Sequence, residues 1–433
     1  MGVEDRLSLP EGARAAAVVA GCSPMQALPQ TLARAVVPAG VRSVLERLLS
    51  SGHEAWLVGG GVRDLLRGQN PKDWDVATDA VPEQVVKLFR RVVPTGIAHG
   101  TVTVLVPGGQ VEVTTFRAES AYLDGRRPES VAFHRDLVAD LARRDFTINA
   151  LAFDPVGSRF RDPFGGQEDL ARRRVRCVGV AAERFGEDGL RPLRAVRFAT
   201  VLEFELDPET EAAIPGALPV FDKVALERRR DELLKLLLAP GVVRGLELLR
   251  RTGLLERLLP ELDEQGDPER IARVDRAAPV LEVRLAALLM GLTQVESALD
   301  RLRLPAKAVE TVRALLGHPL PPEASTWSDA ELRRWLVRLG PERWELARGL
   351  ARASGADPDG ALGERLAAIV AARPPLSAKD LALNGTQIMK SLGIGPSPAV
   401  GEATRFLLEA VLDRPELNTP EHLQALLRDR GGG

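Results

Sequence analysis

The fold is decided by a stretch near the N-terminus that reads LVGGGVRD at residues 57–64, followed by DWD at residues 73–75. The first run predicts a short buried strand that ends in glycines and leads into a helix, and residues 73–78 alternate as a second strand. Glycines at a strand end let the backbone approach a phosphate closely, and the N-terminus of the following helix aims its amides at that phosphate. The stretch therefore indicates a small α/β unit with an anion-binding turn.

Three carboxylates are expected near this turn. Side chains two residues apart on a strand share a face, so Asp73 and Asp75 are predicted to project side by side. Glu112 stands between Val111 and Val113 on another predicted strand and therefore faces away from the core. Two carboxylates fixed in this way can hold a divalent cation such as magnesium, and three are typical of two-metal phosphoryl transfer. Each feature alone is typical of a turn, a solvated loop or an exposed strand, and only their order and spacing favour a function.

Length and composition limit the classes to which the chain can belong. Its 433 residues exceed what one hydrophobic core usually supports, so several domains are expected. Only 4% of the residues are aromatic and the net charge is −2, which argues against rows of base-stacking aromatics and against a uniformly basic nucleic-acid binder. Two cysteines fit neither a disulfide framework nor a cysteine-based zinc site, and no stretch has the apolar length of a membrane span. A cytoplasmic protein is expected.

The chain divides into a mixed part and a helical part. Between residues 41 and 160, helical spacing over 41–49 and 82–89 alternates with strands, and residues 101–106 and 110–116 flank a Pro-Gly-Gly turn typical of a hairpin. Beyond residue 170 only helical periodicity remains. Helices are expected at residues 183–202, 226–238, 242–259, 283–292, 309–316, 329–339, 342–353, 361–372, 378–392 and 400–411.

Five blocks in order resemble the signatures of the class II tRNA nucleotidyltransferase and bacterial poly(A) polymerase family. They are residues 57–78, 113–117 (VTTFR), 143–150 (RRDFTINA), 162–170 (DPFGGQEDL) and 187–197 (EDGLRPLRAVR). The resemblance implies an α+β fold, in which an N-terminal nucleotidyltransferase head with a polymerase β-like α/β palm precedes an all-α neck, body and tail. The implied segments are a mobile extension at 1–30, the head at 31–174, the neck at 175–262, the body at 263–350 and a tRNA-binding tail at 351–433.

The resemblance also assigns nucleotide binding to single residues of two blocks. Gly60 and Arg63 belong to the first signature, beside the expected phosphate. Arg144, Asp145 and Asn149 belong to the block that selects the ribose in the family.

The last block chooses the nucleotide in this family. On the expected helix Asp188 and Arg191 are three residues apart and share a face. A carboxylate accepts hydrogen bonds and a guanidinium donates them, whereas cytosine and adenine each present an amino donor beside a ring-nitrogen acceptor. Asp188 and Arg191 are therefore expected to accept C and A and to reject U and G. Glu187 is implied to orient this pair, and Arg194 and Arg197 to meet the triphosphate; the alternative is a solvated amphipathic helix rich in arginine.

The resemblance implies an enzyme that adds CMP, CMP and AMP to the tRNA 3′ end from CTP and ATP, without a template and with Mg²⁺. No membrane and no protein partner are expected. Residues 122–128 (YLDGRRP) are similar to the flexible loop of family members that add A, and residues 290–291 (MG) stand where hydrolytic relatives carry His-Asp. The alternatives are an A-adding tRNA nucleotidyltransferase or a poly(A) polymerase and, from another class, a non-catalytic RNA-binding paralogue.

Overall fold

A computed structural model describes residues 26–97, 100–117, 136–262, 267–356 and 358–431. The chain forms two units, Met1–Val224 and Ala225–Gly433. The division falls inside the neck expected at residues 175–262, so the first part of that segment belongs with the head. In the described part of the chain, no helix is long and apolar enough to cross a membrane.

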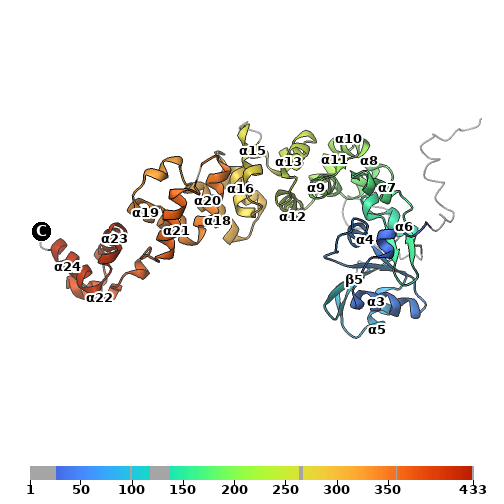
Figure 1. The fold of residues 1–433 in the computed structure, drawn as a ribbon, viewed down its shortest axis with the longest axis horizontal. Helices are drawn as coiled ribbons and strands as arrows, with labels where there is room; N and C mark the ends of the chain where they lie inside the picture. The colour runs from blue at the N-terminus through green and yellow to red at the C-terminus, as the bar shows by residue number, and fades with distance from the viewer. Residues whose placement is uncertain (1–25, 98–99, 118–135, 263–266, 357, 432–433) are drawn as a thin grey trace, which may run out of the picture. The chain divides into compact units, whose positions relative to one another are not determined.

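The first unit is built on a seven-stranded sheet with the order β3-β4-β5-β2-β1-β6-β7. Figure 1 labels its strand β5. Its strands are β1 (Ala55–Val58), β2 (Asp75–Thr78), β3 (Val92–Gly96), β4 (Thr101–Val106), β5 (Gly109–Thr115), β6 (Ala152–Asp154) and β7 (Arg159–Arg161). β2 and β5 run parallel, whereas the other neighbouring strands are antiparallel. The four expected strands are confirmed, including the hairpin of β4 and β5. β3, β6 and β7 were not predicted; β6 and β7 have only three residues each, which is too short for a periodic signal.

The central strands are buried on both faces, so the sheet has a core on each side. Leu57 and Val76 face a core that is closed by four helices, whereas Trp56 and Ala77 face a second core that α6 (Leu137–Ala142) covers. The four helices are α2 (Gln30–Ala33), α3 (Ala39–Ser50), α4 (Gly60–Leu66) and α5 (Pro82–Leu88). Helices α3 and α5 confirm the helices expected at residues 41–49 and 82–89.

Residues 26–30, the last part of the expected N-terminal extension, pack on the head. Gln26 forms a β-bridge with Phe160, and its side-chain amide donates a hydrogen bond to the Asp162 carbonyl at 2.8 Å. Leu32 in α2 is buried. Residues 26–30 therefore belong to the folded head, which differs from the expectation of a mobile segment, and residues 1–25 lie outside the described residues.

The helix expected at residues 183–202 is interrupted, so this prediction is wrong in one respect. The first unit ends with α7 (Gly166–Ala171), β8 (Arg174–Val175), α8 (Ala181–Glu187), α9 (Arg191–Leu202), β9 (Glu205–Leu206), α10 (Pro208–Ala212) and α11 (Ile214–Phe221). The chain leaves the helix between α8 and α9, where a Cβ on Gly189 would lie only 2.5 Å from the Val220 carbonyl oxygen. This close approach to α11 requires glycine. Pro192 consequently lies in the first turn of α9, where proline is well tolerated.

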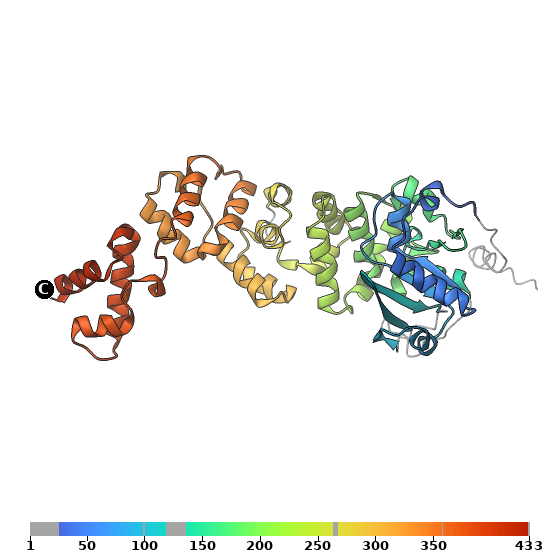
Figure 2. The same ribbon diagram turned by 60° about the horizontal axis from the view of Figure 1, so that its bottom comes forward.

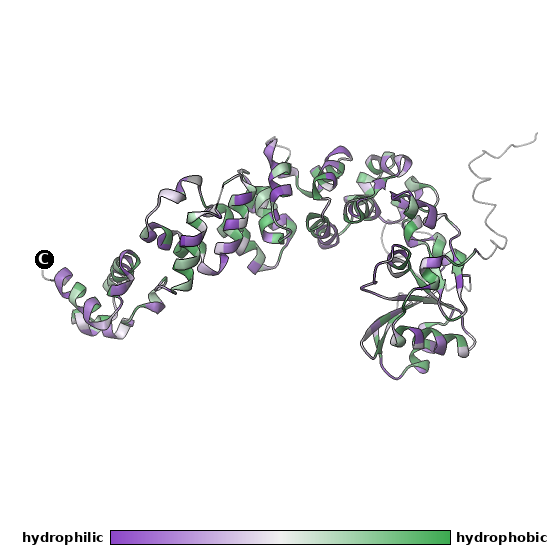
Figure 3. Ribbon diagram, viewed as in Figure 1, coloured by the Kyte–Doolittle hydropathy of each residue, from purple (hydrophilic) through white to green (hydrophobic). Residues whose placement is uncertain are grey.

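In the described part of the second unit every regular element is helical (Figure 2). The α-helices are α12 (Leu226–Leu237), α13 (Val242–Arg251), α14 (Leu254–Leu258), α15 (Glu269–Arg276), α16 (Leu281–Leu289), α17 (Val295–Leu302), α18 (Ala306–Gly317), α19 (Asp329–Leu339), α20 (Trp344–Ala353), α21 (Ala361–Ala371), α22 (Gly385–Leu392), α23 (Pro398–Asp413) and α24 (Pro420–Gly431). Many are amphipathic, with apolar residues along one side and polar residues along the other (Figure 3). Two expected helices are split, at Gly253, which has a φ of +76°, and before Asn384, whose side chain caps α22. Helices α15, α17 and α24 were not predicted.

Candidate active site

Two of the expected carboxylates are neighbours across the parallel strands. Asp75 begins β2 and lies directly opposite Glu112 of β5. Val111 and Val113 are buried, whereas Glu112 is exposed, so the alternation predicted for this strand is confirmed. The sheet therefore presents these two acids side by side at one position.

Asp73 lies before the strand rather than in it. β2 begins at Asp75, and the exposed Asp73 stands in a bend, so the prediction that both project from one strand is wrong. The chain bends at Asp73 where it passes the start of α4: a Cβ on Gly61 would lie 3.4 Å from the Asp73 carbonyl oxygen, at van der Waals distance.

The charges around Asp75 favour a bound cation. Burial raises the pKa of Asp75 above its ordinary value, and Arg144 opposes this increase. The nearby charges of Glu112 and Asp73 raise the pKa of Asp75 further. A divalent cation at this position would relieve the repulsion between the carboxylates.

Gly59 allows the backbone to approach this cluster. Its φ is +71°, a conformation that favours glycine, and a Cβ here would lie 3.0 Å from Arg144 Nη1 and 3.5 Å from Asp75 Oδ2. Gly60 follows as the first residue of α4. The glycine turn predicted from the sequence therefore passes directly beside the acid cluster.

A buried acid that was not predicted holds Arg144. Asp140 in α6 is 0% exposed and accepts hydrogen bonds from Arg143 at 2.7 and 2.9 Å and from Arg144 at 3.3 Å. Burial alone would raise the pKa of Asp140, but the two guanidinium groups outweigh burial and hold the pKa below its ordinary value. The spacing of Asp140 three and four residues before these arginines was the signal available in the sequence.

The ribose-selecting block is joined to its neighbours by a chain of hydrogen bonds. Arg63 Nη1 donates to Asn149 Oδ1 at 2.8 Å, and Asn149 Nδ2 donates to Asp145 Oδ1 at 3.0 Å. Arg194 then donates twice to Asp145 Oδ2, at 2.9 and 2.5 Å. Burial would raise the pKa of Asp145, but Arg194, Asn149 and the Phe146 amide together hold that pKa below its ordinary value. This chain links α4, the ribose block and α9.

The residues expected to choose the base lie at the junction between α8 and α9. Asp188 has an extended backbone after α8, so the prediction that it shares a helix face with Arg191 is wrong. Its Oδ1 accepts from the Leu190 amide at 3.0 Å, and its carbonyl accepts from the Arg191 amide at 3.0 Å. The two residues are therefore brought together by a turn that starts α9.

Arg191 is firmly held. It is 8% exposed, and its guanidinium donates to Glu187 Oε2 at 2.5 Å and to the carbonyls of Arg184 and Arg143, both at 2.9 Å. Arg184 also donates to both oxygens of Glu187, at 2.9 and 3.0 Å. Glu187 thus lies between two arginines, and Arg184 is a contact that sequence reasoning missed.

The residues at the acid cluster fit a magnesium ion, although the side chains do not form a complete cage. Among the described residues, no group of three or more His, Cys, Asp or Glu side chains is placed to hold a metal ion by itself. Magnesium, however, usually takes one or two protein carboxylates together with water and substrate phosphates. Asp75, with Glu112 directly opposite and Asp73 nearby, offers carboxylates of that kind.

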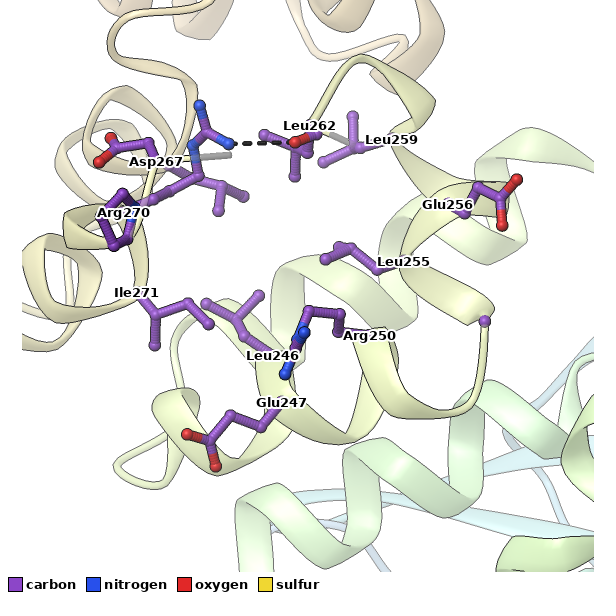
Figure 4. A pocket seen from close by; sticks show the side chains of 13 residues that line it. Leu246, Glu247, Arg250, Leu255, Glu256, Leu259, Leu262, Asp267, Arg270 and Ile271 are labelled. Atoms are coloured by element: carbon purple, nitrogen blue, oxygen red, sulfur yellow. Dashed lines mark hydrogen bonds between the residues drawn. The ribbon is translucent and has the colours of Figure 1, made fainter. Parts of the chain in front are cut away.

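A cavity of about 560 Å³ lies elsewhere, between α13, α14 and α15 in the second unit (Figure 4). Arg270 in its wall donates a hydrogen bond to the Leu262 carbonyl at 3.2 Å. None of the predicted site residues lines this cavity. The candidate site residues all belong to the first unit. Residues 122–128, expected to form a flexible loop, lie outside the described residues.

Family descriptions match three parts of the chain. Residues 55–176 match the Poly A polymerase head domain, residues 203–265 the probable RNA and SrmB-binding site of polymerase A, and residues 283–427 the putative domain 2 of tRNA nucleotidyltransferase. The first match covers the sheet, the acid cluster and the ribose block. The head is thus a nucleotidyltransferase head of this polymerase class.

Similar proteins narrow the class. The CCA-adding enzyme of Geobacillus stearothermophilus is 38% identical over 392 residues, which cover 89% of this chain and 96% of that protein. The CCA-adding enzyme of Streptococcus sanguinis is 36% identical, with the same coverage. The crystal structure of the Bacillus stearothermophilus CCA-adding enzyme in complex with CTP has a TM-score of 0.79 at 36% identity, covering 90% of this chain and 96% of that one. The chain belongs to the CCA-adding enzyme family.

Proposed function

We propose that the protein adds CMP, CMP and AMP to the tRNA 3′ end from CTP and ATP, without a nucleic-acid template. Similarity to CCA-adding enzymes along most of the chain supports this activity. The observation that carries the proposal is the hydrogen-bonded chain from Arg63 through Asn149 and Asp145 to Arg194, because it unites the phosphate turn, the ribose block and the base-choosing helix. The substrates are therefore a nucleoside triphosphate and an RNA 3′ end.

In the proposed reaction the tRNA 3′-hydroxyl attacks the α-phosphorus of the nucleotide and pyrophosphate leaves. Asp73 and Asp75 would hold the divalent cation, which we take to be magnesium, and Glu112 is the third carboxylate of the site. When bound, magnesium makes the hydroxyl more acidic and neutralises charge on the departing pyrophosphate. Arg194 and Arg197 contribute positive charge for the triphosphate, as the resemblance implies.

The base is selected by a fixed hydrogen-bonding pattern. Asp188 would accept the amino proton of C or A, and Arg191 would donate to the adjoining ring nitrogen. Arg191 is held by three acceptors of the protein, so it cannot swing away to suit another base. U and G would leave a donor or an acceptor unpaired, which selects strongly against them.

Asp145 and Asn149 form the proposed ribose contact. Both are buried and already hydrogen-bonded to each other, so their orientation is set before the nucleotide arrives. Arg144, held by Asp140 and lying beside Gly59 and Asp75, would meet the phosphates.

The second candidate function is addition of A alone or of a poly(A) tail. It is favoured by the match of residues 55–176 to the Poly A polymerase head domain. A non-catalytic RNA-binding paralogue accounts less well for the chain, because all three carboxylates and both base-choosing residues are present.

The test of the active site uses Asp75→Asn with labelled CTP and a tRNA transcript that lacks CCA. Transfer should fall at least about 100-fold, the upper end of the effect of changing a group that merely supports metal ligands. Glu83→Gln is the matched control, because Glu83 is an exposed acid of the same unit on α5. Retention of tRNA binding with loss of transfer supports the proposal. Transfer by Asp75→Asn at the rate of the control would refute this metal assignment.

A further inference from the structure

Three guanidinium groups of the proposed nucleotide site lie around one phenylalanine ring. Phe198 in α9 is 8% exposed. The guanidinium carbons of Arg197, Arg63 and Arg194 lie 3.8, 5.4 and 5.4 Å from the centroid of its ring. Arg63 comes from α4 in the head, whereas the other two arginines belong to α9. Sequence reasoning did not single out Phe198.

Three guanidinium groups this close together repel one another, so the arrangement requires partners that attract positive charge. The negative face of an aromatic ring attracts cations, and the attraction is stronger when water is excluded, as it is around this nearly buried ring. Carboxylates contribute as well: Asp64 contacts Arg63 at 2.9 Å, and Asp145 contacts Arg194. The Phe198 ring is a partner that all three share.

A second aromatic ring fixes the orientation of the Phe198 ring. Phe146 of the ribose block meets Phe198 with ring centroids 5.5 Å apart and an interplanar angle of 74°, which is an edge-to-face contact. Phe146 is fully buried, and it directly follows Asp145, which binds Arg194. The orientation of the ring is therefore set by the same block that holds the ribose-selecting residues.

We propose that Phe198 is a positioning residue that holds these three guanidinium groups together so that they bind the triphosphate of the incoming nucleotide. The inference rests on the proposed function, because it takes a nucleoside triphosphate as the ligand. Positive groups fixed in place before binding stabilise a polyanion more than mobile ones, since no reorganisation is needed when the anion arrives. The ring itself touches no reacting atom.

A packing role for Phe198 predicts a different behaviour. Loss of packing would lower stability and weaken every ligand of the site alike. Loss of positioning would weaken CTP much more than CMP, because only CTP carries the two further phosphates. The ratio of the Kd for CMP to the Kd for CTP therefore separates the two roles.

The experiment measures both Kd values by calorimetry on the full chain for Phe198→Leu, Phe198→Tyr and Phe185→Leu. Phe185 is a fully buried phenylalanine of α8 over which no guanidinium is recorded in the described part of the chain, so it controls for loss of a core ring. Phe198→Leu should reduce the CMP-to-CTP ratio about 5–30-fold, the size expected when several cation–π contacts are lost. Phe198→Tyr, which keeps an aromatic face, should stay near the wild-type ratio, and the KM for CTP should follow the Kd.

Three results would overturn the inference. Equal weakening of CMP and CTP in Phe198→Leu assigns the ring to packing alone, as does misfolding of both Phe198→Leu and Phe198→Tyr while Phe185→Leu folds. A wild-type protein that binds no CTP would instead remove the proposed function, and the inference with it.

Discussion

Replacement of Glu187 by Gln tests whether the base-choosing arginine must be held by a charged partner. Glu187 Oε2 accepts from Arg191 at 2.5 Å and from Arg184 at 2.9 Å, and Oε1 accepts from Arg184 at 3.0 Å. In Glu187→Gln one amide oxygen can still accept hydrogen bonds, but the negative charge is lost and the amide NH2 cannot accept from an arginine. Arg191 would retain its two backbone acceptors, the carbonyls of Arg184 and Arg143. The variant should therefore fold, with Arg191 less firmly oriented.

The size of the expected effect follows from the loss of the negative charge that Arg191 contacts on Glu187. A hydrogen bond to a charged group contributes about 1.5–3 kcal/mol, and each 1.4 kcal/mol is a factor of ten. If that energy holds Arg191 in the base-reading orientation, kcat/KM for CTP and ATP should fall about 10–100-fold. Misincorporation of UMP should fall less, so discrimination between CTP and UTP should narrow.

The assay compares single-nucleotide incorporation from CTP and UTP on a tRNA transcript that lacks CCA. Glu183→Gln is the control, since Glu183 is an exposed residue of the same helix. Thermal unfolding of both variants checks that the fold is intact. An unchanged ratio of CTP to UTP incorporation in Glu187→Gln would show that Glu187 does not orient the selecting pair.

Two further predictions concern Asp140 and the loop at residues 124–127. The pKa of Asp140 is lowered on folding, so its contribution to stability is present above the ordinary aspartate pKa of about 3.9 and is lost as the pH falls through the lower pKa of the folded state. Asp140→Asn should lower the free energy of unfolding by about 2–4 kcal/mol at pH 7. Urea titrations of the variant and the wild type should show this difference shrinking toward pH 3. A difference in unfolding free energy that does not depend on pH would contradict the ion-pair account. Deletion of residues 124–127, which lie outside the described residues, should leave addition of CC nearly intact and stop AMP addition in a gel assay, and continued AMP addition would refute that role of the loop.

The sequence was sufficient where a local pattern decided the structure. The apolar run at residues 55–58, the alternation around Glu112 and the Pro-Gly-Gly turn each depend on neighbours in the chain, and each was confirmed. The family blocks added the candidate site, because their order and spacing carry information that one motif lacks. Strands of three residues such as β6 had no such signal.

The errors share a physical cause, which is contact with distant parts of the chain. The predicted helix at residues 183–202 ignored the approach of Gly189 to Val220, and the predicted strand ignored the passage of Asp73 beside Gly61 of α4. Phe198 was overlooked partly for this reason, because Arg63 of α4 lies over its ring, whereas Asp140 was overlooked although its two arginines follow three and four residues later. Their importance lies in the arginines that folding brings around them, and only part of that arrangement is visible in the spacing of residues.

The most direct measurement of the central claim offers single labelled nucleotides to the purified protein with three tRNA transcripts: one that lacks CCA, one that ends in CC and one that is complete. The account predicts CMP addition to the first, AMP addition to the second and no addition to the third, with no incorporation of UMP or GMP. Addition of AMP to the second transcript without any CMP addition to the first would identify an A-adding enzyme instead. Addition of AMP to all three would indicate a poly(A) polymerase, and no addition to any transcript would contradict the nucleotidyltransferase account altogether.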